Sequence, residues 1–167
     1  MDRLLLIDGN SLLNRAFFAM PLLTAPDGTY TNAVYGFLNM FYSALEQCEP
    51  THIMVAFDRR EPTFRHKEYK DYKAGRKPMP DELIPQFPLL RQTLTRMNVP
   101  TCDLVGYEAD DLLGTLSRIS DENGGTCVIL SGDKDTLQLI SEQTTVWITK
   151  RGISETEKFD GAHLKEV

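Results

Sequence analysis

The feature that most constrains the fold of this chain is a set of short, continuous apolar runs, three of which are closely followed by an aspartate. Residues 4–7 (LLLI), 53–57 (IMVAF) and 127–130 (CVIL) are partly β-branched and bounded by polar residues. Such runs predict strands that are buried on both faces, as in a parallel sheet. Val146-Trp147-Ile148 is a weaker fourth candidate, and residues 101–105 are a fifth.

Longer segments with helical periodicity separate these runs. Between the first two runs, apolar residues recur at a 3.6-residue period, and Pro50 marks the end of that segment. The apolar stripe consists of Val34, Phe37, Leu38, Phe41 and Leu45. Two more helices are predicted over 81–97 and 108–119, the latter closed by Asn123-Gly124-Gly125. Strands that alternate with helices indicate βαβ units, so we expect one α/β domain over residues 1–167, with a mostly parallel central sheet flanked by helices.

Length and composition narrow the class of protein. The 167 residues, 41% hydrophobic and 25% charged, suffice for one domain with a buried core. No apolar run approaches the ~18 residues needed to cross a bilayer, so no membrane partner is expected. Cys48, Cys102 and Cys127 are far apart and lack metal-site spacing. They predict reduced thiols and a cytoplasmic location rather than a disulfide framework.

Seven carboxylates are predicted to gather at one edge of the sheet. Asp8 and Asp58 directly follow the first two strands, and Asp133 follows the third after two intervening residues. The ligand crevice of an open parallel sheet lies outside the carboxyl ends of its strands, where these side chains would meet. The other members of the set, which open a helix or follow the third strand, are Glu108, Asp110, Asp111 and Asp135.

Each carboxylate also has a purely structural explanation. Asp8 suits a turn, Asp58 suits the end of a strand, and Asp135 suits the N-cap of a helix. Acids in a first helical turn gain about 0.3–1 kcal/mol from the helix dipole. Carboxylates gathered at one edge, however, repel one another by about 1 kcal/mol per 4 Å pair in water, and by about 4 kcal/mol at an effective dielectric of 20. Divalent cations offset this repulsion, and all-oxygen ligation predicts Mg²⁺ or Mn²⁺.

The formal net charge of −6 hides a basic segment over residues 59–77, RREPTFRHKEYKDYKAGRK. This segment holds eight basic and three acidic residues, a net charge of +5, whereas the rest of the chain holds 10 basic and 21 acidic residues. A solvated charged helix is the ordinary explanation of such a run. Phe64, Tyr69 and Tyr72 stand among the cations, however, and this mixture is typical of single-stranded nucleic acid binding. Cations beside a carboxylate cluster predict phosphodiester hydrolysis at two metal ions ~3.5–4 Å apart.

Six stretches of the sequence resemble one family. They read LLLIDGNSLLNRAFFA, TNAVYGFLNM, PTHIMVAFD, PTFRHKEYKDYKAGRKPMPDEL, GYEADDLLGTL and SGDKDTLQLIS. Almost from end to end, the chain resembles the N-terminal 5′-nuclease domains of bacterial DNA polymerases I, in the flap-endonuclease group of the PIN-like (resolvase-like) superfamily. The resemblance implies a PIN-like fold with a basic helical arch over about residues 59–90. It also implies a metal-dependent 5′→3′ exonuclease and flap endonuclease that acts on DNA with 5′ flaps or 5′ ends, in replication primer removal and repair.

The resemblance assigns roles to individual residues. The seven carboxylates match the family's metal-binding acids, which hold Mg²⁺ or Mn²⁺, with two ions in the full-length domain. Lys73 and Arg76 match catalytic basic residues of the arch that contact the scissile phosphate, and Tyr72 matches an aromatic placed to stack near the 5′ end. The DNA-binding residues expected in this arch are Phe64, Arg65, Tyr72, Lys73, Arg76 and Lys77. Arg15 lies in a motif near the site and receives no role.

Two departures from the family pattern affect the expectations. The residues common after the family's second-strand aspartate, which is Asp58 here, are smaller than those of this chain, Arg59-Arg60-Glu61. This difference predicts an altered approach to the site. Full-length relatives continue past the position of Val167 into another acidic motif, a helix-hairpin-helix that grips duplex DNA, and a polymerase domain. We therefore expect the chain to be the N-terminal part of a monomeric bacterial protein with a covalently linked polymerase domain. Its first metal site is expected to be largely complete and its second to be weakened.

Three alternatives stay open at this point. A receiver-type signalling domain also gathers aspartates and Mg²⁺ at strand ends, but it has an acidic pair after the first strand, where this chain has only Asp8. A PIN-type ribonuclease shares the acids and usually lacks so long a basic arch. The third alternative is a truncated nuclease domain that binds DNA without cutting it.

Overall fold

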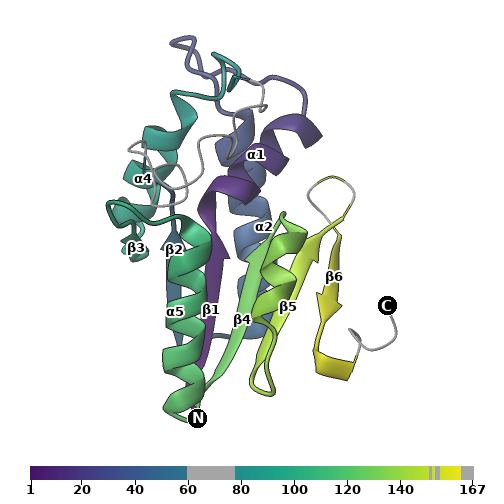
Figure 1. Ribbon diagram of the computed structural model, residues 1–167. Helices are drawn as coiled ribbons and strands as arrows, with labels where there is room; N and C mark the ends of the chain where they lie inside the picture. Colours follow the sequence, from purple (N-terminus) through teal and green to yellow (C-terminus); the bar gives the residue numbers. More distant parts are fainter. Residues whose placement is uncertain (60–77, 151, 153–154, 163–167) are drawn as a thin grey trace.

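A six-stranded sheet forms the centre of the computed structural model (Figure 1), which describes residues 1–59, 78–150, 152 and 155–162. The strands are β1 (Arg3–Asp8), β2 (His52–Ala56), β3 (Thr101–Cys102), β4 (Thr126–Ser131), β5 (Thr144–Thr149) and β6 (Thr156–Phe159). Their order across the sheet is β3-β2-β1-β4-β5-β6, and neighbouring strands run parallel except for the antiparallel pair of β5 and β6. The predicted mostly parallel α/β sheet is confirmed.

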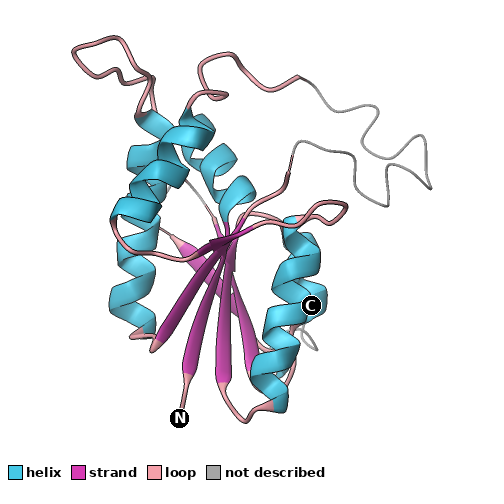
Figure 2. Ribbon diagram, turned by 90° about the vertical axis from the view of Figure 1, so that its left-hand side faces the viewer, coloured by secondary structure: helices cyan, strands magenta, loops and turns pink. Residues whose placement is uncertain are grey.

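Helices cover both faces of the sheet (Figure 2). They are α1 (Gly9–Ala19), α2 (Asn32–Cys48), α4 (Gln86–Arg96), α5 (Ala109–Glu122) and the short 3₁₀ helix η1 (Lys134–Leu139). Helices α1, α2 and α4 pack on one face, and α5 packs on the other. Within the described ranges, none of the helices combines the length and the apolar character needed to span a membrane.

The apolar runs are continuous because each central strand faces two cores. In β1, Leu5 and Ile7 contribute to the core under α1, α2 and α4, whereas Leu6 contributes to the core under α5. The same alternation occurs in β4, where Leu130 joins the first core and Ile129 the second. Full burial of an aliphatic side chain of this size contributes about 1.5–3 kcal/mol, so the two layers of helices hold the sheet from both sides.

Parallel pairing brings the ends of β1, β2 and β4 level with one another. Asp8 ends β1 and is paired with Ala56 on β2, and the residue before it is paired with Leu130 on β4. Asp58 and Asp133 follow shortly after β2 and β4, so they reach the same edge as Asp8. The chain continues from β1 to one side of the sheet and from β4 to the other. This reversal is a topological switch point, where open α/β sheets bind their ligands.

Helix α1 is a feature that the periodicity did not predict. It begins directly after β1, with Asp8 as its N-cap, whose carboxylate accepts a hydrogen bond from the Ser11 N–H. A Cβ at position 9 would lie 2.6 Å from the ring of Phe57, so the first helical residue has to be glycine. Because no loop separates the strand from the helix, the capping bond and this close approach together fix Asp8 at the sheet edge.

Other elements differ from the predictions at their ends. The helix expected over 81–97 begins only at Gln86, and the helix expected over 108–119 extends to Glu122. The candidate strand over 101–105 is confined to the two residues of β3. Strand β6 was not predicted, since its sequence TEKF has one apolar residue and its pairing depends on the neighbouring β5. The strand order also differs from the 2-1-3-4-5 order of receiver-type domains, which excludes that alternative.

Candidate metal-binding site

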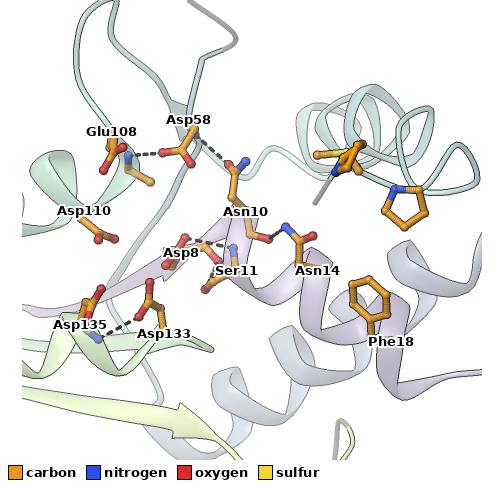
Figure 3. A pocket seen from close by; sticks show the side chains of 14 residues that line it. Asp8, Asn10, Ser11, Asn14, Phe18, Asp58, Glu108, Asp110, Asp133 and Asp135 are labelled. Atoms are coloured by element: carbon orange, nitrogen blue, oxygen red, sulfur yellow. Dashed lines mark hydrogen bonds between the residues drawn. The ribbon is translucent and has the colours of Figure 1, made fainter. Parts of the chain in front are cut away.

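A cavity of about 560 Å³ lies at the carboxyl edge of the sheet, beside the switch point between β1 and β4 (Figure 3). Carboxylates from four separate segments line it. They are Asp8, Asp58, Glu108, Asp110, Asp133 and Asp135. The structure therefore brings together six of the seven acids that the sequence analysis selected, although they span 128 positions of the chain between Asp8 and Asp135.

Asp8 is the most enclosed of these acids, with 4% of its surface exposed. Its Oδ1 accepts from the Ser11 N–H at 3.3 Å, and its Oδ2 accepts from the Ser131 hydroxyl at 3.0 Å. Burial raises the pKa of the Asp8 carboxyl, and the hydrogen bonds from the two serines counteract only part of that effect. These two serines therefore hold a costly buried charge in one orientation.

Asp58 is held by one hydrogen bond of its main chain and one of its side chain. Its N–H donates to the side-chain oxygen of Asn10 at 2.8 Å, and its Oδ1 accepts from the Ala109 N–H at 2.6 Å. Figure 3 shows Asp58 between Asn10 on α1 and the start of α5. The end of β2, the start of α1 and the start of α5 are thus tied together at this carboxylate.

The three acids at the start of α5 do not all face the cavity. Glu108 is the N-cap and Asp110 lies in the first turn, and both line the cavity. Asp111 does not line it, and its Oδ2 accepts from the Glu108 N–H at 2.9 Å as part of a capping box. Asp111 therefore has an evident structural role in the start of α5, and metal binding by this residue stays a prediction.

Among the acids that line the cavity, Asp110 has a strongly raised pKa. Burial, together with the negative charges of four nearby carboxylates, raises the pKa of Asp110 from 3.8 to about 7. Those neighbours are Asp8, Asp133, Asp58 and Glu108. Both causes act in the same direction, because the carboxyl group is shielded from water and the neighbouring charges disfavour its ionisation; a bound cation would offset the second cause.

The acids after β4 are arranged around the start of η1. Asp133 is its N-cap, with its Oδ1 accepting from the Asp135 N–H at 2.9 Å. The Asp133 N–H donates to the Ser131 hydroxyl at 3.0 Å. Ser131 therefore bonds both Asp8 and the main chain of Asp133, and it couples the two strands that flank the switch point.

The donor set fits a hydrated divalent cation. Carboxylate oxygens are the ligands that Mg²⁺ and Mn²⁺ prefer, and Mg²⁺ commonly keeps several water ligands and binds one or two carboxylates. Among residues 1–59, 78–150, 152 and 155–162, no group of three acidic, histidine or cysteine side chains forms a ready-made metal site. The acids instead surround a cavity wide enough to accept an ion together with its waters.

Three polar residues that hydrogen bond the acids of the site were not selected from the sequence. The side chain of Asn10 accepts from the Asp58 N–H. The Asp8 carboxylate accepts from the Ser11 N–H and from the Ser131 hydroxyl. The spacing from Asp8 to Ser11 is that of an N-cap and the first turn of its helix, which would have been a usable signal. The role of Ser131 had no such signal, because its partner is distant in the sequence.

The predicted arch residues lie outside the described part of the chain. They are Phe64, Arg65, Tyr72, Lys73, Arg76 and Lys77. Arg59, at the start of the basic segment, is described, and its guanidinium forms an ion pair with Asp103. The assignments within the arch therefore stay predictions.

Comparison with known proteins identifies close relatives. The family model described as "5′-3′ exonuclease, N-terminal resolvase-like domain" matches residues 3–167. DNA polymerase I of Geobacillus stearothermophilus is 49% identical over 158 residues, which are 95% of this chain and 18% of that protein. DNA polymerase I of Bacillus subtilis (strain 168) is 46% identical over 164 residues, which are 98% of this chain and 19% of that protein. The chain spans less than a fifth of the length of these relatives.

Solved structures show the same fold at low sequence identity. The T5 D15 protein co-crystallised with metal ions has a TM-score of 0.73 at 18% identity, over 98% of this chain and 60% of that chain. The T5 5′-exonuclease with bound zinc has a TM-score of 0.71 at 17% identity, over 98% of this chain and 60% of that chain. These similarities confirm the prediction of a PIN-like 5′-nuclease fold.

Proposed function

The chain belongs to the family of 5′-3′ exonuclease N-terminal, resolvase-like domains, and from that membership we propose that it hydrolyses DNA phosphodiester bonds at 5′ ends and 5′ flaps with divalent metal ions. Its relatives are DNA polymerases I, of which it matches less than a fifth. We further propose that it is the 5′-nuclease part of such a polymerase, with a role in primer removal and repair. A monomeric state and a cytoplasmic location stay predictions.

The observation that carries this proposal is the convergence of carboxylates from the ends of β1, β2 and β4 and from the start of α5 on one cavity. The pKa of Asp110, raised to about 7, supports a role in cation binding rather than in helix capping alone. A nuclease of this kind has to neutralise a phosphate diester in its transition state, and an acidic cavity can do so only by holding cations. The metal ions are expected to be Mg²⁺ or Mn²⁺, with two in a complete domain.

The residues of the cavity hold the acids in place before any substrate arrives. When bound, divalent cations supply Lewis acidity at the phosphate and lower the pKa of a nearby water. Asp8 and Asp133 present oxygen donors from either side of the switch point, while Ser131 fixes their relative position. Asn10 and the Ala109 N–H hold Asp58. Such preorganisation means that little reorganisation is needed when charge develops at the phosphate.

The basic segment supplies the second half of the proposed mechanism. By the family resemblance, Lys73 and Arg76 neutralise charge on the scissile phosphate, and Tyr72 stacks on a base near the 5′ end. Aromatic stacking of this kind contributes about 1–3 kcal/mol per base in single-strand binding proteins. The cations and the carboxylates are therefore assigned complementary roles toward the same phosphate.

The decisive experiment is cleavage of a labelled 5′-flap DNA by the 167-residue chain, with Mn²⁺ or with EDTA. We expect Mn²⁺-dependent cleavage that is lost in Asp8→Asn and retained in Asp27→Asn, a matched change at an exposed acid. Lys73→Ala and Arg76→Ala are each expected to slow cleavage by about 10²-fold. Equal cleavage by these variants and the parent chain would show that the arch assignment is wrong, and preference for single-stranded RNA would favour a PIN-type ribonuclease.

A second candidate function is DNA binding without cleavage. The observation that favours it is that Asp111, one of the seven predicted metal ligands, does not line the cavity and instead accepts a capping hydrogen bond at the start of α5. Binding of the flap DNA in Ca²⁺ or Mn²⁺, without cleavage in any metal, would support this candidate. Restored cleavage after extension of the chain with the next segment of a related polymerase would then assign the deficit to an incomplete second metal site.

A further inference from the structure

Asp103 lies just outside the acidic cavity, where the chain leaves β3. The Phe57 N–H donates to the Cys102 carbonyl at 2.9 Å and so joins the ends of β2 and β3. The next residue after Phe57 is Asp58, and the next residue after Cys102 is Asp103. Asp103 does not line the cavity, and its side chain is 16% exposed. It therefore lies beside the acidic cavity without lining it.

Two arginines from different segments converge on this carboxylate. Arg59 Nη1 lies 3.1 Å from Asp103 Oδ1, and Arg91 of α4 forms an ion pair with Oδ2. The Arg91 guanidinium also lies over the ring of Phe57, with its carbon 5.0 Å from the ring centroid. Arg91 is thus held by an aromatic face and by Asp103 together, which makes Asp103 a fixed acceptor for Arg59.

Arg59 lies next to the acidic cavity in the sequence, so its ion pair with Asp103 affects where its positive charge lies. Arg59 directly follows Asp58, whose carboxylate lines the cavity with five other acids. A guanidinium tethered one residue away has a high effective concentration at these carboxylates, and it would compete there with an inorganic cation. It would also repel a divalent ion bound nearby.

We propose that Asp103 is a positioning residue that holds the Arg59 guanidinium on the outer side of Asp58 and so reserves the acidic cavity for metal ions. The inference rests on the proposed function, because it assumes that the cavity binds divalent cations. It also gives a physical account of how this chain accommodates arginine at a position where the sequence resemblance leads one to expect a small residue.

The test is Mn²⁺ binding to the 167-residue chain, measured without DNA by the electron paramagnetic resonance signal of free Mn²⁺. Asp103→Asn is expected to raise the Kd for Mn²⁺ by about three- to tenfold, because a guanidinium that has lost its ion pair with Asp103 competes for the cavity. The double variant Asp103→Asn with Arg59→Gln is expected to regain a Kd within about twofold of Arg59→Gln alone, since the competitor is gone. A purely structural role of Asp103 would not be reversed by this second substitution.

Two further variants serve as controls. Glu157→Gln removes the acid of a comparable ion pair with Lys150, at the other edge of the sheet, and should leave the Kd unchanged. Asp103→Glu keeps the negative charge and should also bind Mn²⁺ like the parent chain, which keeps the test usable if Asp103→Asn does not fold. The inference is overturned if Asp103→Asn binds as the parent does, if the double variant stays weak, or if Asp103→Glu loses affinity as Asp103→Asn does. Failure of the unsubstituted chain to bind Mn²⁺ would instead overturn the proposed metal site itself, and this inference with it.

Discussion

Replacement of Asp110 by asparagine should stabilise the metal-free protein, by an amount that grows between pH ~4 and pH ~7 and is largest above pH 7. In the folded protein, burial and four neighbouring carboxylates raise the pKa of Asp110 from 3.8 to about 7. The folded state therefore holds this proton more tightly than the unfolded chain does. The contribution of Asp110 to the free energy of unfolding is therefore most favourable below pH ~4, falls as the pH rises toward 7, and reaches its low plateau above 7.

The size of the effect follows from the shift. One pKa unit corresponds to about 1.4 kcal/mol, so a shift from 3.8 to about 7 gives an upper bound of about 4 kcal/mol. Asp110 retains some contact with solvent, so we expect about 2–4 kcal/mol. Asparagine keeps the shape of the side chain and removes its charge. At pH 8, Asp110→Asn should therefore exceed the parent chain in free energy of unfolding by this amount, and near pH 4 the two should be equal.

The assay is urea unfolding followed by far-UV circular dichroism, in EDTA, at pH 4 and pH 8. The free energy of unfolding should depend on urea concentration with the same slope in Asp110→Asn and in the parent chain, so that their unfolding midpoints can be compared. Asp27→Asn is the control, because hydrogen bonds from Thr29 lower the pKa of Asp27 and its neutralisation should bring no gain at pH 8. The reasoning is refuted if Asp110→Asn is no more stable than the parent at pH 8, or if it is equally stabilised at both pH values.

Three other outcomes are expected. Ser131→Ala should lower the free energy of unfolding by about 1.5–3 kcal/mol, since it removes a buried hydroxyl that donates to the Asp8 carboxylate. A loss below about 0.5 kcal/mol in urea unfolding would contradict this. Gly9→Ala should lower the free energy of unfolding by about 1–3 kcal/mol, because its Cβ would lie 2.6 Å from the Phe57 ring. Gly161→Ala is the control: its Cβ would have no atom within 4 Å, so it should match the parent chain in the same assay. Millimolar Mn²⁺ should raise the Tm at pH 8 by binding the folded state, and an unchanged Tm would argue against a metal site in the folded protein.

The sheet and its acidic edge could be predicted because each strand carries its own signal. A run such as residues 4–7 is apolar on both faces since both faces are covered, and parallel pairing brings the ends of such strands to one edge. Asp8, Asp58 and Asp133 could therefore be placed together from their positions after the strands.

Features that depend on contacts between distant segments could not be predicted in this way. Strand β6 has little apolar character, and its pairing is decided by the exposed edge of β5. The choice between Asp110 and Asp111 depends on where α5 begins, because successive helical residues point about 100° apart. A start at Ala109 directs Asp110 to the cavity and lets Asp111 cap the helix, and the sequence alone did not fix that start.

The central place of β1 in the sheet has a consequence for biosynthesis. β1 pairs with β2 and with β4, and the hydrogen bond between Asp8 and Ser131 joins residues 123 positions apart. During translation, the first acid of the cavity emerges from the ribosome long before its partners, so the nascent chain offers no closed pocket to an ion until β4 and η1 have been made. Metal uptake would then mark the completion of the domain during synthesis rather than its nucleation.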